Sequence, residues 1–412
     1  MLQRNFILIM FCLCPVVAHA FPGAGAINMT FNTSARAAGM GGAGVAVAWD
    51  TETNHWANPA LLAFRPGIHY RSFESKLAEG LADDIFLTNE ELTFGAYGVT
   101  LLLAKGPVEG NYLDMGVQEG TDENGNSTGT FQSYMKSESI GLGVESVEIL
   151  ERILNKHPGS WTRYVSFAGG IAWHDFLDVL APEGFYEDYG GQNGEGTATS
   201  MGYVLRLTPV DMSRGAGLMD NGLFGLSVGG SYGASILNKT DEFIHHFEGS
   251  QGDPFPRTYV SGWAANAQLT LADDTRLKLN ELGFGFLGDM INPLVSFTKA
   301  EQLMEPGFTW NPDTSEYDYG HDTSGLRDKK NRGWELGLLN IFFIREGNIL
   351  VEYGDIEGPT DGGGWKIQAG RFGGFRKDWA TVPQAAGLPT VDRKTWSIWL
   401  NPLEIVNAFS TN

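Results

Sequence analysis

The stretch that decides the fold is Tyr164-Val165-Ser166-Phe167-Ala168-Gly169-Gly170-Ile171-Ala172-Trp173-His174. Large apolar residues occupy alternate positions, and the residues between them are small or polar. Side chains in a β-strand alternate between two faces, so this stretch would have one apolar face and one small face. A strand of about 9 to 11 residues with an apolar lipid face is typical of a transmembrane barrel. The stretch therefore predicts one strand of such a barrel.

The same alternation recurs in three further stretches, Ser200 to Thr208, Phe224 to Gly233 and Tyr259 to Leu271. Their second face carries mostly Gly, Ser, Ala and amides, whereas the wet face of a soluble sandwich would be rich in charged residues. The pattern favours the crowded interior of a barrel. Weaker strand candidates are Ile68 to Glu74, Leu92 to Leu103, Phe131 to Gly143, Leu277 to Phe286, Trp334 to Phe343, Ile349 to Gly354, Trp365 to Phe372 and Trp396 to Leu400.

Polar stretches too long for hairpin turns separate these strands, and they predict long loops on one rim of the barrel. They are Gly106 to Gly129, Pro182 to Gly196, Asn238 to Pro256, Pro306 to Asn331 and Lys377 to Lys394. Ser146 to Asn155 differs, because its apolar residues have helical spacing and His157-Pro158-Gly159 follows it. It predicts one short amphipathic helix.

Residues 1 to 20 have the form of a cleaved signal peptide. Arg4 precedes the apolar run Ile7 to Val17, and Ala18-His19-Ala20 fits a small-x-small cleavage site. The apolar run is shorter than the roughly 20 residues that a membrane-spanning helix needs. We therefore expect an exported protein located in the bacterial outer membrane.

Composition agrees with this class of protein. Glycine supplies 55 of the 412 residues, only 19% of residues are charged, and both cysteines lie in the expected leader. Without Arg4, the expected mature chain has 27 basic and 49 acidic residues, a net charge of −22. This charge would repel the phosphates of nucleic acid, so we expect no nucleic-acid partner.

Motifs that usually carry chemistry stand here in the wrong context. Gly39 to Gly44 matches G-x-G-x-x-G but follows no apolar strand, and Gly225 to Gly229 matches G-x-S-x-G within a continuous alternating strand. The loop at Asp122 begins like a calcium loop but lacks its sixth-position glycine and its final Glu. We expect no enzyme activity, no cofactor and no metal site. The remaining enzyme hypothesis, an outer-membrane hydrolase, would depend on Ser227.

The segment near the N-terminus carries a family resemblance. Ser34-Ala35-Arg36-Ala37-Ala38-Gly39-Met40-Gly41-Gly42-Ala43, Val45-Ala46-Val47-Ala48, Asp50 and Trp56-Ala57-Asn58-Pro59-Ala60 closely resemble the N-terminal signature of the PorV/PorQ family of FadL-like outer-membrane proteins. A second patch, Gly333 to Leu339 with Arg345-Glu346-Gly347 and Gly370 to Gly374, is similar too. The chain departs from the signature at Trp49, Ala57 and Leu61.

The resemblance implies a FadL-like antiparallel barrel of about 14 strands over residues 65 to 412, with residues 21 to 64 folded inward as a hatch. It places the hatch or gate at Gly39, Gly41, Gly42, Asn58, Pro59 and Ala60. The implied function is a passive route for hydrophobic small molecules. The alternative is a PorV-like scaffold of type IX secretion, whose partners would be proteins of the secretion machinery.

Overall fold

The decisive stretch forms most of strand β6 (Val165–Ala181) in the computed structural model, and the exposure of its side chains alternates. Phe167 and Trp173 are each 49% exposed, whereas Ala168 and His174 are buried. The apolar side chains thus point outward, as the sequence predicted. The structure describes residues 25–50, 52–77, 82, 84–121, 127–154, 164–181, 192–211, 223–246, 252–271, 290–311, 316–319, 329–351, 356–384 and 388–410.

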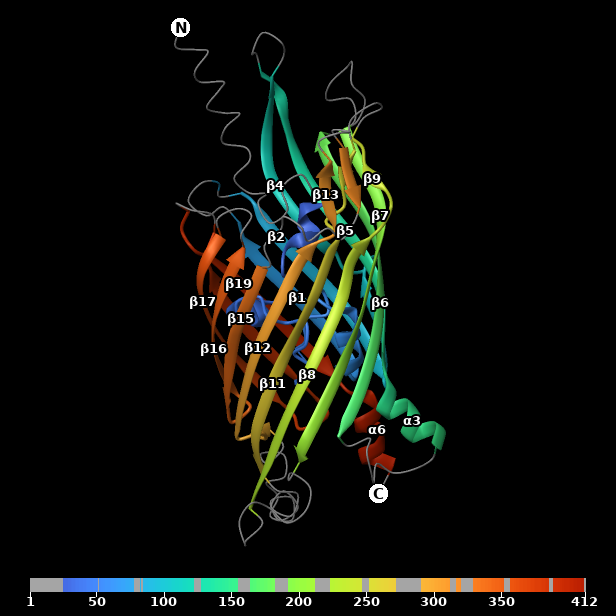
Figure 1. Ribbon diagram of the computed structural model, residues 1–412, viewed down its shortest axis with the longest axis vertical. Coiled ribbons are helices and arrows are strands. Elements are labelled where there is room, and N and C mark those ends of the chain that lie inside the picture. The colour runs from blue at the N-terminus through green and yellow to red at the C-terminus, as the bar shows by residue number, and fades with distance from the viewer. Residues whose placement is uncertain are drawn as a thin grey trace.

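Fifteen strands join one antiparallel sheet that closes on itself through the pairing of β1 with β2 (Figure 1). Strands β3 and β4 share one place between β2 and β5, which gives a closed barrel of 14 positions, the predicted fold. The barrel strands are β1 (Gly67–Lys76), β2 (Phe86–Ala96), β3 (Val99–Ala104), β4 (Gly110–Thr121), β5 (Ser127–Glu145), β6, β7 (Gln192–Asp211), β8 (Phe224–Lys239), β11 (Thr258–Leu271), β12 (Val295–Pro306), β15 (Lys329–Leu338), β16 (Phe342–Val351), β17 (Ile356–Gln368), β18 (Gly373–Val382) and β19 (Val391–Leu400).

The shared position of β3 and β4 is a break in the wall. Leu103 pairs with Leu92 of β2, and Gly110 pairs with Glu90. Only Glu91 of β2 lies between these two pairs, so residues 105–109 have no place in the ladder and loop out of it. On the other side, β5 runs past the break without interruption. We call residues 105–109 the strap.

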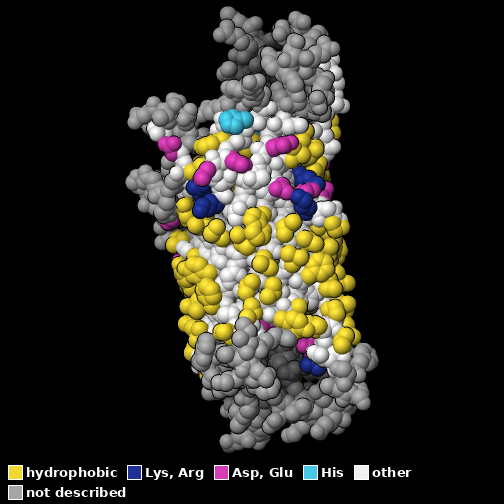
Figure 2. Space-filling view, turned by 90° about the vertical axis from the view of Figure 1, so that its right-hand side faces the viewer, with side chains coloured by type: hydrophobic (Ala, Val, Ile, Leu, Met, Phe, Trp, Pro, Cys, Tyr) yellow, Lys and Arg dark blue, Asp and Glu magenta, His cyan; other side chains and the backbone are white. Residues whose placement is uncertain are grey.

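The outer surface carries a broad apolar belt, with charged side chains gathered above it (Figure 2). Exposed apolar residues come from strands all around the barrel, among them Phe94, Leu101, Trp263, Ile344 and Ile398. A belt of this kind matches the hydrocarbon layer of a bilayer. No helix in the described part of the chain is long and apolar enough to cross a membrane.

The two ends of the barrel differ. At one end lie α3 (Ser146–Leu154), α6 (Pro402–Ser410) and the short turns after β2, β15 and β17, and we call it the helix end (Figure 1). At the other, the loop end, the β4/β5 hairpin projects and two small ribbons lie nearby, β9 (Phe243–Ile244) with β10 (Asp253–Pro254) and β13 (Phe308–Asn311) with β14 (Glu316–Tyr319). The predicted helix is α3. The expectation of one short helix missed α6 and α2 (Ala35–Gly39).

Several strand and loop boundaries predicted from the sequence are wrong. The candidate Leu92 to Leu103 crosses the turn at Tyr97-Gly98, and Trp334 to Phe343 crosses the turn at residues 339–341. The predicted loops Gly106 to Gly129 and Lys377 to Lys394 are largely strand. These strands extend beyond the apolar belt, where both faces meet water and apolar and polar residues need not alternate. Leu277 to Phe286 lies outside the described residues.

Candidate functional site

The N-terminal segment fills the barrel from inside (Figure 1). Described from residue 25 onward, it enters near β10, where the Gly25 amide donates to the Pro254 carbonyl over 3.0 Å. It passes through η1 (Ile27–Thr30) and α2, and it ends in η2 (Pro59–Phe64) just before β1. The helix α2 lies against β16 to β19, and η2 lies against β3 and β5 to β7. We call this segment the hatch.

The hatch backbone packs directly on glycines of the wall. A Cβ added to Gly170 would lie 2.3 Å from the Pro59 carbonyl carbon, and one on Gly333 would lie 2.4 Å from the Met40 carbonyl oxygen. Only glycine allows main chains to approach this closely. Inward-facing glycines on eight strands meet the N-terminal segment at such distances, six of them its backbone and two, Gly202 and Gly262, the side chains of Asn58 and Val45: Gly95, Gly143, Gly170, Gly202, Gly233, Gly262, Gly333 and Gly347.

The glycine cluster of the hatch closes a helix. Ser34 caps the start of α2 by accepting a hydrogen bond from the Ala37 amide, and Gly39 is its last residue. Gly41 and Gly42 follow with φ of +68° and +83°, the left-handed region that favours glycine. A Cβ on Gly41 would lie 2.5 Å from the Asn348 carbonyl oxygen of β16. The cluster is therefore a tight helix end pressed against the wall.

Asn58 joins three parts of the structure. Its side-chain amide donates to the carbonyls of Val45 in the hatch and Tyr203 in β7, both over 3.0 Å. Its Oδ1 accepts from the Ala60 amide, which caps η2, and Pro59 occupies the first turn of that helix. Asn58, Pro59 and Ala60 are all buried. The six residues predicted as hatch or gate thus all contact the wall or one another deep in the lumen.

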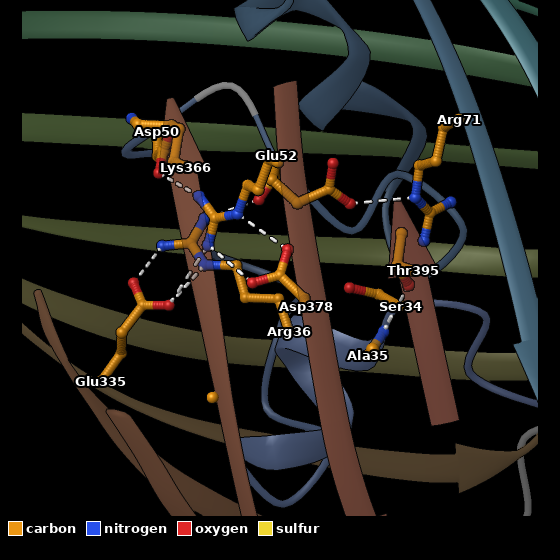
Figure 3. Close-up of polar contacts among 12 residues, drawn as sticks. Ser34, Ala35, Arg36, Asp50, Glu52, Arg71, Glu335, Lys366, Asp378 and Thr395 are labelled. Carbon is orange, nitrogen blue, oxygen red and sulfur yellow. Dashed lines mark hydrogen bonds and ion pairs between the residues drawn. The ribbon is translucent and has the colours of Figure 1, made fainter. Parts of the chain in front are cut away.

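A network of buried charges ties the hatch to the wall (Figure 3). Arg36 of α2 reaches Glu335 of β15 over 2.7 Å, and Glu335 also accepts from Arg345 of β16 over 2.6 Å. All three side chains are less than 6% exposed. The network continues through Asp378 and Arg376 of β18 to Asp50 of the hatch, which also pairs with Lys366 of β17 over 3.2 Å.

A second group of buried charges holds the end of the hatch. Glu91 of β2 lies 2.8 Å from Arg65, 3.3 Å from Arg71 of β1 and 2.9 Å from His55. Arg71 also pairs with Glu52 of the hatch over 2.9 Å. Removal of one member of a buried pair leaves an uncompensated charge, which typically costs about 3 to 5 kcal/mol. The hatch is therefore bound firmly at the level of these two networks.

The sequence analysis missed both networks. A usable signal existed, because Glu335, Arg345, Arg376 and Asp378 occupy the face of their strands that alternates away from lipid. Charges on that face indicate partners inside the barrel. The partners themselves could not be named, since Arg36 and Glu335 are 299 positions apart in the chain.

The loop end of the lumen is closed by an apolar cluster. Ala26 at the start of the hatch packs with Ile244 of β9 and Phe255 beside β10, against wall residues such as Phe73 and Phe176. Tyr319 of β14 supports them, since its hydroxyl accepts from the Phe255 amide over 2.8 Å and donates to the Glu242 carbonyl over 2.6 Å. We call η1, β9, β10 and Phe255 the cap, and from here on the name hatch is kept for residues 32–64, which follow η1.

A cavity of about 160 Å³ lies between cap and hatch, and we call it the chamber. Its lining is mainly apolar, with a few amides and the guanidinium of Arg393: Met29, Phe31, Trp56, Leu237, Val260, Met304, Ile349, Ile356, Asn54, Gln302, Asn331 and Arg393. A separate cavity of about 480 Å³ opens at the helix end, lined by Trp49, Phe64, Arg206 and α3 residues. The hatch separates the two cavities.

The G-x-S-x-G motif lies within a barrel strand. Ser227 lies within β8, paired with Gln268 of β11, rather than at a strand-to-helix turn. Asp122 to Asn126 lie outside the described residues. The described residues include no group of three or more His, Asp or Glu side chains placed to hold a metal ion.

Comparisons with known proteins found distant structural likenesses. The toluene transporter TbuX of Ralstonia pickettii has 9% identity and a TM-score of 0.38, with 90% of this chain and 98% of that chain covered. A FadL homologue of Pseudomonas aeruginosa has 8% identity and a TM-score of 0.35, with 90% and 98% covered. The toluene transporter TodX of Pseudomonas putida has 9% identity and a TM-score of 0.32, with 88% and 95% covered.

No protein-family model matches the chain, and no curated protein matches its sequence significantly. The sequence identities and TM-scores of these structures are too low to support an inference about the function of this chain.

Proposed function

We propose that the chain is an outer-membrane protein of the FadL-like type that gives hydrophobic small molecules a route into the membrane, with the loop end facing outward. The observation that carries the proposal is the chamber, a mainly apolar cavity inside the lumen between the cap and the hatch. An apolar lining with few polar groups is characteristic of sites for small ligands.

The route enters through the cap and leaves through the wall. The hatch blocks the way to the helix end with two buried charge networks. The ladder of the wall is interrupted at the strap, between β3 and β4. Within the strap, Val108 is buried, whereas Lys105 pairs with Asp175 over 2.7 Å through two exposed side chains. Exposed ion pairs are weak because water and salt screen them. The strap therefore opens more easily than the hatch.

In this proposal the predicted gate residues serve as a seal. Gly39, Gly41 and Gly42 pack closely against β15, β16 and β17, and Asn58 ties the hatch to β7. The passage of an apolar molecule requires no chemistry, so the proposal includes no enzyme activity and no cofactor.

The test is uptake of a radiolabelled monoaromatic hydrocarbon by cells whose outer leaflet is lipopolysaccharide, with and without the protein. We expect faster uptake with the wild type and a large loss with Ile349→Trp, which fills the chamber. Ile344→Trp is the matched control, because Ile344 lies on the same strand but is 51% exposed on the outside. Uptake that is unchanged by the protein would refute the proposal.

The second proposal, a PorV-like secretion scaffold, is favoured by one feature, the β4/β5 hairpin that projects beyond the barrel at the loop end (Figure 1). A scaffold would bind secretion proteins there and would need no chamber. Replacement of the hairpin tip by a two-residue turn should then abolish secretion of cargo with type IX signals and leave hydrocarbon uptake unchanged. The opposite result would favour the transport route.

A further inference from the structure

A groove of about 470 Å³ lies on the lipid-facing wall, away from the lumen and the strap. It crosses β7, β8, β11 and β12. One cross-strand row forms its floor and sides, because Tyr203 pairs with Ala234, Ala234 pairs with Ser261, and Ser261 pairs with Leu303. The two central residues are small and the two outer ones are large, so the row is concave toward the membrane.

Large side chains close the groove above and below this row. The next row toward the loop end carries Met201, Ile236, Tyr259 and, at its β12 end, Glu305, the one charged residue that lines the groove. The next row toward the helix end carries Tyr232 and Trp263. Met201, Tyr232 and Trp263 are between 38% and 46% exposed. The result is a pocket with an aromatic rim, set within the apolar belt.

Small residues occupy both faces of the wall at this groove. On its inner side, Gly202, Gly233 and Gly262 face the lumen, where they contact Val45 and the Asn58 side chain of the hatch. Ala234 and Ser261 occupy the outer side. Small residues on both faces leave a hollow that no side chain of the wall fills.

We infer that this groove is a binding site for one acyl chain of a membrane lipid. Met201 and Tyr203 line the groove and belong to the exposed apolar side chains of the belt, so the surroundings of the groove are acyl chains rather than water. Its lining is mostly apolar and its volume falls within the range of small-ligand sites. A chain seated on Ala234 and Ser261 regains packing contacts that an empty hollow lacks.

The groove is tested with the full-length protein in phosphatidylethanolamine vesicles that contain a lipid with a diazirine on its acyl chain. After irradiation, adducts are mapped by mass spectrometry. We expect residues of the groove to carry at least threefold more label per residue than the rest of the belt. Even labelling around the belt would overturn the inference, whether or not any variant folds.

The double variant Ala234→Phe/Ser261→Phe fills the floor and should remove the enrichment. Ala265→Phe is the matched control, because Ala265 faces lipid on the same strand outside the groove, and it should leave the enrichment intact. Enrichment that survives the double variant would overturn the inference. Displacement of the lipid label by an added monoaromatic hydrocarbon would assign the groove to transported molecules and would overturn it as well.

Discussion

The hatch and the cap close the two ends of the same lumen by different kinds of contact. The hatch is held by main-chain packing on wall glycines and by buried ion pairs such as Arg36 with Glu335. The cap is held by apolar side chains such as Ile244 and Phe255, which come from a loop between β8 and β11 rather than from the wall. The chamber lies between these two closures.

The difference indicates which end opens. Movement of the hatch would separate buried charges and would expose backbone that fits only against glycine. Movement of the cap separates a loop from an apolar surface, which is a local event of lower free energy. We therefore expect the lumen to open at the loop end while the hatch remains in place.

The largest expected effect is at the hatch network. Glu335→Gln should lower the free energy of unfolding by about 3 to 5 kcal/mol, because it leaves buried guanidinium groups of Arg36 and Arg345 without their full partner. Glu346→Gln is the control, since Glu346 is exposed on the neighbouring strand, and it should change stability by about 0.5 kcal/mol or less. Denaturant unfolding in detergent measures both. Equal effects would mean that the network does not hold the hatch.

The next effect separates two adjacent glycines. Gly170→Val places a side chain where Pro59 and Ala60 of the hatch lie, and overpacking of this kind costs about 1 to 3 kcal/mol. Gly169→Val has open space on the other face of the same strand and should be nearly neutral. The readout is the temperature at which the band of folded protein disappears on a detergent gel. A larger loss for Gly169→Val would show that the glycines do not serve hatch docking.

A cap variant should act locally. Phe255→Ala removes a fully buried ring from the cap, so amide exchange in residues 25–31 and 243–246 should become faster. The midpoint of global unfolding should change little, because the wall and hatch contacts remain. Hydrogen exchange with mass spectrometry measures the two effects together. A fall in global stability as large as that of Glu335→Gln would erase the distinction between cap and hatch.

The smallest effect is a pH dependence of the cap. His246 hydrogen-bonds through Nε2 to the Asp178 carboxylate over 2.9 Å, and this bond raises the pKa of His246 above its usual value near 6.5. Asp253 lies nearby, and burial raises the pKa of its carboxyl. A raised pKa in the folded cap means that the contact stabilises the cap fully below about pH 6.5 and weakens as pH rises through the folded pKa. The protection of cap amides, which is the exchange rate corrected for the intrinsic pH dependence of amide exchange, should therefore be greater at pH 5.5 than at pH 8, and His246→Gln should reduce this difference.

The barrel wall could be predicted from the sequence because the alternation of apolar residues with small or polar ones determines which side chains face lipid. Lipid outside and a crowded lumen inside impose alternation, and this placed Phe167, Leu205 and Trp263 on the correct face. The boundaries failed where that rule stops, as at the Tyr97-Gly98 turn and in the polar strands beyond the belt.

The interior of the barrel could be predicted only in part. The small residues of the hatch indicated close packing, and the resemblance singled out residues such as Gly41 and Asn58, which the structure places in contact with β16 and β7. The charged partners depend on which strands face each other across the lumen. Alternation contains no information on that, so the contact of Arg36 with Glu335 required the structure.

The central claim is that the hatch stays docked while molecules pass. The expected mature chain lacks cysteine, so Ala57→Cys/Ser235→Cys introduces one thiol in the hatch and one in the wall, at the contact where the Ser235 hydroxyl donates to the Ala57 carbonyl over 2.6 Å. Hydrocarbon uptake is then measured with the pair oxidised and after reduction. The account predicts equal uptake in both states. Uptake that stops on oxidation and returns on reduction would show that the hatch must move, and it would contradict the account.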